Sequence, residues 1–225
     1  MAGRPLAVDV VLEVGAKRIF ASAVDWPGWS RSGRGEEAAL DALAGYAGRY
    51  APVPATAGIA FAAGRPGGVP TLIVVERVRG DATTDFGAPG AVAGPDFRPV
   101  GVRDAGRLAN LVEAAWGFLD DVAASAPAQL RKGPRGGGRD RDAMLRHVAN
   151  AEAAYARRIG LRLREPDEGD VDAVRANRAA ILEVLRRPSD GERLVEPKGW
   201  PGRYAARRIA WHALDHAWEM QDRSD

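Results

Sequence analysis

The stretch RRIAWHALDHAWEMQDR (residues 207–223), near the end of the chain, holds two of the three histidines of the protein. His212 and His216 are four residues apart, and residues at this spacing lie about 40° apart on one face of an α-helix. Both imidazoles can therefore reach the same point. The apolar spacing around them predicts a helix over 202–223 that carries a chelating pair of histidines.

The third histidine, His147, lies in a second stretch that predicts a helix, residues 139–159, beside the apolar side chains of Met144 and Val148. If this helix faces the last one, all three imidazoles can meet at one site. Three neutral imidazoles suit Zn, Ni, Fe or Cu, and three protein ligands leave a coordination position open for water or substrate. The alternative is three ordinary core or surface histidines, since pairs at this spacing also arise by chance.

Two further side chains of the last predicted helix are candidates for a role beside the histidines. Glu219 follows His216 by three residues on the same stripe, where it could orient an imidazole or act catalytically as a proton acceptor. Its alternative is a surface pair with Arg223. Arg208, one turn before His212, could bind an anionic group of a cofactor, and its alternative is a solvated surface arginine.

The second half of the chain predicts helices separated by segments rich in Gly and Pro, which end one helix and start the next. Four helices of about 20 residues joined by loops predict an antiparallel four-helix bundle over residues 102–225. Residues 80–101, also rich in Gly and Pro, are expected to form a linker before this bundle. The predicted helices cover 102–125, 139–159, 168–187 and 202–223.

The first part of the chain, residues 1–79, predicts a small α+β unit with three or four strands. AVDVVLEV (7–14) and IFASAV (19–24) have the pattern of a β-hairpin, and PTLIVVERV (70–78) that of a further strand. EEAALDALAGYAGRYA (36–51) predicts one helix of about four turns, with two glutamates in its first turn, where the helix dipole favours them. The expected fold class is α+β, with an all-α second part.

Composition excludes several classes of function. Charge is nearly balanced, at 32 basic and 30 acidic residues, without the strongly basic surface that nucleic-acid binding usually needs. MAGRPLAVDV (1–10) has no charged leader followed by an apolar run, and no stretch approaches the roughly 18 apolar residues of a membrane span. We therefore expect a cytoplasmic protein with no nucleic-acid or membrane partner. The chain has no cysteine, so any thiol in its chemistry must come from outside.

Residues 102–225 resemble the DinB-like four-helix-bundle superfamily, which includes mycothiol- and bacillithiol-dependent transferases and mycothiol-dependent maleylpyruvate isomerases. The matching features are the histidine of LRHVANAE (145–152) and the H-x-x-x-H of AWHALDHAWEMQDR (210–223). The resemblance implies that His147, His212 and His216 bind a divalent metal ion: Zn, Ni or Fe, with Zn preferred. In the first part, FASAVDWPGWSRSGRGEEA (20–38) is similar to the strand, Pro-Gly turn and helix start of HicB-like domains.

Two functions follow from these expectations. The first is a metal-dependent thiol S-transferase or isomerase, in which the open metal position lowers the pKa of a small thiol or of water. Its partners would be a small-molecule substrate and a low-molecular-weight thiol, with mycothiol as the candidate, and a homodimer is left open. The alternative is a non-catalytic, metal-stabilised regulatory or interaction protein with a HicB-like module. A three-ligand site with an open position favours the enzyme.

Overall fold

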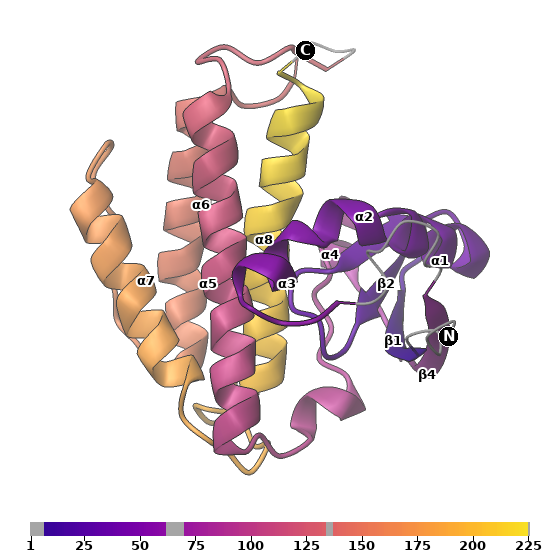
Figure 1. The fold of residues 1–225 in the computed structure, drawn as a ribbon. Coiled ribbons are helices and arrows are strands. Elements are labelled where there is room, and N and C mark those ends of the chain that lie inside the picture. Colours follow the sequence, from indigo (N-terminus) through magenta and orange to yellow (C-terminus); the bar gives the residue numbers. More distant parts are fainter. Residues whose placement is uncertain (1–6, 62–69, 134–136, 225) are drawn as a thin grey trace.

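The computed structural model describes residues 7–61, 70–133 and 137–224. A four-stranded sheet near the N-terminus is followed by helices, which confirms the α+β class (Figure 1). The strands lie in the order β3-β2-β1-β4, with β1 antiparallel to β2 and parallel to β4. Parallel strands need a long crossover connection. For β1 and β4, the helices between β3 and β4 form part of that connection. The strands are β1 (Ala7–Val14), β2 (Ile19–Ala23), β3 (Ser30–Gly33) and β4 (Thr71–Arg79).

The prediction of one four-turn helix over 36–51 is wrong. The chain instead forms three short helices. The first ends at Gly45, and a glycine within a helix is less favourable than an alanine by about 1 kcal/mol. Tyr50 is fully buried, and its hydroxyl donates to the carbonyl oxygen of Pro27 at 2.9 Å. These contacts turn the chain away from a straight helix. The three helices are α1 (Glu36–Gly45), α2 (Ala47–Tyr50) and α3 (Pro52–Thr56).

Residues 80–101, where the sequence suggests a linker, contain the helix α4 (Ala82–Phe86) and the 3-10 turn η2 (Gly94–Phe97). Glu13 of β1 is buried, and its carboxylate accepts hydrogen bonds from the backbone N–H groups of Gly90 and Ala91. The segment is thereby tied to one face of the sheet. A buried carboxylate is stabilised when several donors satisfy it.

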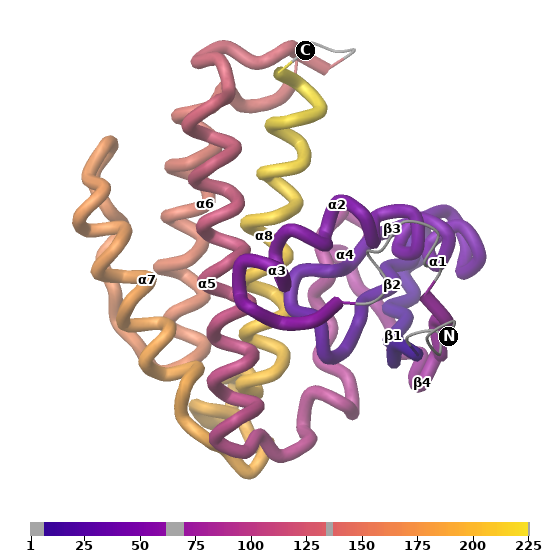
Figure 2. The backbone as a smooth tube through the Cα atoms, in the orientation of Figure 1, coloured from indigo at the N-terminus to yellow at the C-terminus, as the bar shows by residue number. Residues whose placement is uncertain are grey.

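Four long helices make up the second half of the chain, and their apolar faces pack together. The last of them, α8, packs against α5 and α6, while α7 packs against α5 and α6 (Figures 1 and 2). The helix predicted at 102–125 has those bounds. The other three helices begin and end within three residues of their predicted bounds. None of the helices in the described ranges is long and apolar enough to cross a membrane. The bounds are α5 (Val102–Ser125), α6 (Arg141–Ala156) followed by η3 (Arg157–Ile159), α7 (Val171–Leu185) and α8 (Gly202–Asp222).

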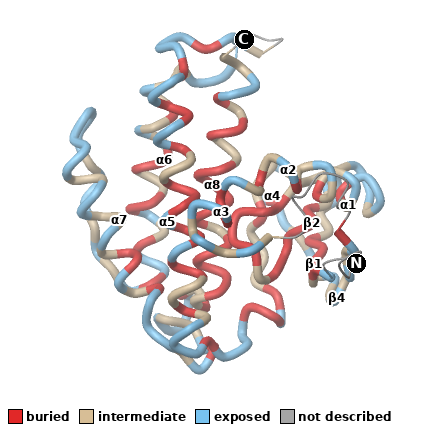
Figure 3. Tube along the Cα trace, in the orientation of Figure 1, coloured by how far each residue is buried: buried red, intermediate tan, exposed pale blue. Residues whose placement is uncertain are grey.

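Helix α8 is buried along most of its length because it lies between the other helices and the sheet (Figure 3). One hydrophobic core runs from the sheet through α5 to α8. Gly28 follows β2 with φ +91°, and a Cβ at this position would lie 2.5 Å from Leu214 on α8. Arg207 of α8 also forms a buried ion pair with Asp96 of η2, at 2.7 and 2.9 Å, which connects α8 to the segment after β4. The sheet thus fixes the helix that carries two of the histidines.

Candidate metal centre

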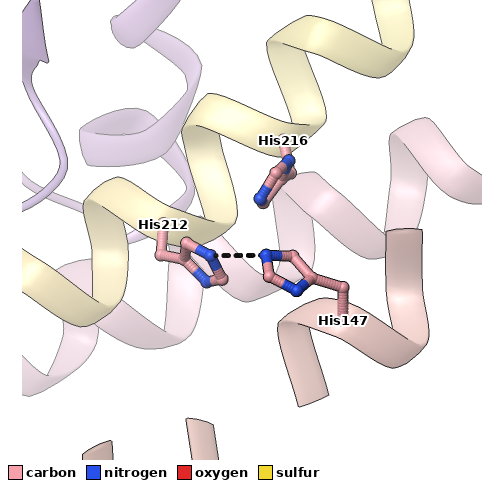
Figure 4. Close-up of side chains that lie close together, drawn as sticks. All are labelled: His147, His212 and His216. Carbon is pink, nitrogen blue, oxygen red and sulfur yellow. Dashed lines mark hydrogen bonds between the residues drawn. The ribbon is translucent and has the colours of Figure 1, made fainter. Parts of the chain in front are cut away.

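The three histidines of the chain meet between α6 and α8. His147 comes from α6, and His212 and His216 come from successive turns of α8, with the three rings turned toward one another (Figure 4). One ligand nitrogen of each lies within 4.8 Å of the other two. The ring centroids are 4.7 to 5.1 Å apart. This group could hold a metal ion.

The spacing of the nitrogens agrees with that of ligands around one ion. Two imidazole nitrogens bound to zinc at about 2.0–2.1 Å in a tetrahedral site lie roughly 3.3–3.4 Å apart. The Nε2 atoms of His147 and His212 are 3.3 Å apart. The ligand nitrogen of His216 lies within 4.8 Å of the other two. Imidazole suits zinc, nickel, iron and copper, whereas calcium and magnesium prefer oxygen ligands.

Burial keeps two of the imidazoles neutral. His212 is 7% exposed, and its burial holds the pKa of that imidazole well below its usual value, with the neighbouring His216 acting in the same direction. Burial, helped by Arg139 and His216, lowers the pKa of His147 to about 4. Neutral imidazole carries the lone pair that a metal needs. Both rings are therefore in the ligating form near pH 7.

Glu219 forms a hydrogen bond with the third imidazole. Its Oε2 atom lies 3.1 Å from Nδ1 of His216, and its Oε1 accepts from Arg223 at 2.7 Å. The bond from His216, and then that from Arg223, lowers the pKa of Glu219, so the carboxylate is ionised and accepts a hydrogen bond from the Nδ1–H group. Nε2 of His216 is then left for the centre, as in the carboxylate–histidine pairs of metal sites. Glu219 therefore pairs with Arg223, as the alternative interpretation expects, and also contacts His216, while its predicted role in orienting the imidazole or accepting a proton stays a prediction.

His212 has no such partner. Its Nδ1 atom is buried, and no residue in the described parts of the chain forms a hydrogen bond with it. The ring is held by packing: its centroid lies 5.6 Å from that of Tyr155 and 6.2 Å from that of Trp211. The orientation of this ligand therefore depends on the aromatic side chains around it.

Arg208 lies one turn before His212 and is enclosed by the same aromatic rings. Its guanidinium carbon is 4.9 Å from the ring centroid of Tyr155 and 4.7 Å from that of Trp211. The Nη1 atom is buried without a hydrogen-bond partner among the described residues. The arginine is thus part of the wall beside the histidines and is not a solvated surface group. Its predicted role in binding an anionic cofactor group stays a prediction.

Sequence reasoning missed two residues that shape the site. Tyr155 follows His147 by eight residues in the same predicted helix, but an aromatic residue there equally indicates core packing. Arg31 of β3 forms an ion pair at 3.0 Å with Asp215, the neighbour of His216. Its guanidinium also lies over the ring of Tyr46. No pattern in the sequence indicates that the sheet would reach this turn of α8.

Comparison with known protein families, with characterised proteins and with solved structures yields no match to this chain. Its function is therefore inferred from the three histidines and their surroundings. Three imidazoles, two of them neutral and one hydrogen-bonded to a carboxylate, form a donor set that suits a transition-metal ion.

Proposed function

We propose that His147, His212 and His216 hold a divalent metal ion, zinc first among Zn, Ni and Fe, and that the protein is a metal-dependent thiol transferase or isomerase. The substrate would be a small molecule and the thiol a low-molecular-weight one of the mycothiol type. The approach of three imidazole nitrogens to within 4.8 Å carries the proposal. When bound, the ion would lower the pKa of a thiol or of water at its open coordination position.

The residues of the chain have separate roles in this proposal. His147 and His212 supply neutral nitrogens because burial lowers their pKa values. Glu219 accepts a hydrogen bond from Nδ1–H of His216 and keeps the other nitrogen of that ring directed at the centre. Arg208, whose buried Nη1 has no partner among the described residues, is placed to attract an anionic group of the thiol or the substrate. The chain contributes no thiol of its own.

The proposed fold family follows the resemblance in the sequence. The packing of α8 against α5 and α6, and of α7 against the same two helices, supports a DinB-like four-helix bundle over residues 102–225. The sheet with α1 supports a HicB-like unit over 1–79. The segment 80–101 would join the two parts.

Turnover with a thiol tests this function. Metal-loaded protein is incubated with mycothiol, or with bacillithiol in a second series, and an electrophilic test substrate, and loss of free thiol is followed. We expect metal-dependent consumption that His212→Ala abolishes, while Arg175→Gln on the exposed face of α7 leaves it unchanged. Metal bound at full occupancy with no turnover for either thiol would contradict the enzyme and favour the non-catalytic regulatory alternative.

A further inference from the structure

A groove of about 600 Å³ lies between the C-terminal end of α6 and the loop that precedes α8. Small-molecule sites in proteins are usually clefts of roughly 300–1,000 Å³, so its size suits a small organic ligand. The side chains that give the groove its chemistry are two aromatic rings, three cations and one carboxylate. They are Tyr155, Trp200, Arg157, Arg158, Lys198 and Glu196.

Tyr155 connects this groove with the three histidines. Its ring centroid lies 5.2 Å from that of Trp200, within the groove, and 5.6 Å from that of His212. One side chain therefore contacts both the groove and a proposed metal ligand. Two aromatic rings at this separation also present the apolar, polarisable surface on which planar molecules stack.

The groove is held in shape by hydrogen bonds between its two walls. Arg158 donates from Nη1 to the carbonyl oxygen of Lys198 at 2.9 Å, and the backbone N–H of Trp200 donates to the carbonyl oxygen of Arg158 at 2.8 Å. At Gly199 a Cβ would lie 2.2 Å from the carbonyl oxygen of Val195, so the loop needs glycine there. A preformed groove avoids the entropy cost of ordering a loop when a ligand binds.

The charge in the groove is positive and unpaired. Arg157, Arg158 and Lys198 face one carboxylate, that of Glu196, and no ion pair joins any of these four side chains to another residue in the described parts of the chain. Elsewhere on the surface most arginines of the helices form ion pairs, as Arg146 and Arg175 do. Exposed cations without partners beside aromatic rings are suited to an anionic ligand.

We propose that this groove binds a small aromatic anion, with the ring against Tyr155 and Trp200 and the anionic group beside Arg157 and Lys198. The groove would then be the acceptor-substrate site of the enzyme. That assignment rests on the proposed function, whereas the binding of an aromatic anion does not.

Binding of 2-naphthoate to the full chain, measured by isothermal titration calorimetry, tests the inference. Its neutral isostere 2-naphthamide and ring-less propionate separate the contributions of charge and ring. We expect naphthoate to bind about tenfold more tightly than either, since the charge contact and the stacked ring each contribute on this order. Equal binding of naphthoate and naphthamide, or no binding of naphthoate, would overturn the proposal.

Variants place the ligand in the groove. Arg157→Gln with Lys198→Gln removes two exposed cations without altering the bonds that hold the loop, and should reduce naphthoate affinity to that of the amide. The matched control, Arg175→Gln on α7 with Arg187→Gln just after it, should bind as wild type does. Equal loss in both double variants would show nonspecific attraction and would overturn the assignment to the groove.

Metal-free protein distinguishes this inference from the proposed function. Naphthoate should bind to protein treated with a chelator about as it does to metal-loaded protein, because the groove does not include a metal ligand. Binding that persists while thiol turnover is absent would reject the enzyme and retain the groove. Turnover with no naphthoate binding would reject the groove alone.

Discussion

At the scale of single residues, the hydrogen bond between Glu219 and His216 is the contact most typical of a metal site. Glu219→Gln keeps the size of the side chain but weakens the acceptor. Loss of such an outer partner typically costs about 10–100-fold in metal affinity, and we expect a loss of this order. Competition with a chromophoric chelator measures it, with Glu183→Gln on α7 as the control.

A Glu219→Gln variant that binds metal as wild type does, yet turns over thiol more slowly, would contradict the orienting role. That result would assign Glu219 to proton transfer. Helical content by circular dichroism should stay unchanged in either case, since Glu219 is at the edge of the core.

The low pKa values of His147 and His212 predict how the stability of metal-free protein depends on pH. Because the folded pKa of His147 is about 4 and the ordinary value is 6.5, the unfolded chain binds more protons between these pH values. The free energy of unfolding should therefore fall as pH is lowered from about 6.5 to 4. Urea titrations at several pH values check this, and His147→Gln should show a shallower decrease. An identical slope in that variant would contradict a low pKa for the imidazole.

At the scale of helices and strands, the sequence predicts most of the long elements because their apolar spacing is regular. The hairpin of β1 and β2, the strand β4 and all four long helices follow from local patterns, and the pairing of His212 with His216 follows from helical spacing. The prediction of one helix over 36–51 fails because the first helix ends at Gly45, and the chain then turns so that Tyr50 packs in the core. Contacts of Arg31 and Tyr155 with the site depend on how distant elements pack, which no local pattern encodes.

The hydroxyl of Tyr50 provides a test of that explanation. Tyr50→Phe keeps the buried ring but leaves the carbonyl oxygen of Pro27 without its donor, and an unsatisfied buried group costs about 1–3 kcal/mol. We expect a decrease of this size in the free energy of unfolding, measured with urea. Tyr46→Phe, whose hydroxyl is only partly buried and accepts at 3.3 Å from Arg49, should cost less. The reverse ranking would contradict a stabilising bond between the Tyr50 hydroxyl and the carbonyl of Pro27.

At the scale of the whole molecule, the sheet and the long helices share one hydrophobic core, and α8 packs between them. Gly28 marks a close approach between them. Gly28→Ala would combine an unfavourable positive φ with a Cβ 2.5 Å from Leu214 and 3.2 Å from Ala210. We expect a loss of roughly 2–4 kcal/mol in the free energy of unfolding, since overpacking adds to backbone strain.

Gly35→Ala is the matched control for this prediction. Gly35 also has positive φ, at +106°, but a Cβ added there would meet no atom within 4 Å. Its substitution should therefore cost only the backbone strain, on the order of 1–3 kcal/mol, and less than Gly28→Ala, because no clash is added. Equal costs at the two glycines would contradict a tight contact between the sheet and α8.

Elemental analysis of the purified protein decides whether the three histidines hold a metal ion. The protein is prepared without a histidine tag, dialysed, and analysed by mass spectrometry for zinc, nickel, iron and copper. We predict about one divalent ion per chain in the wild type, because three imidazoles form one site. His147→Ala, His212→Ala and His216→Ala should each lose it while circular dichroism shows that the helices remain. Wild-type protein without metal after incubation with zinc, or histidine variants that bind it as tightly as wild type, would contradict the metal centre.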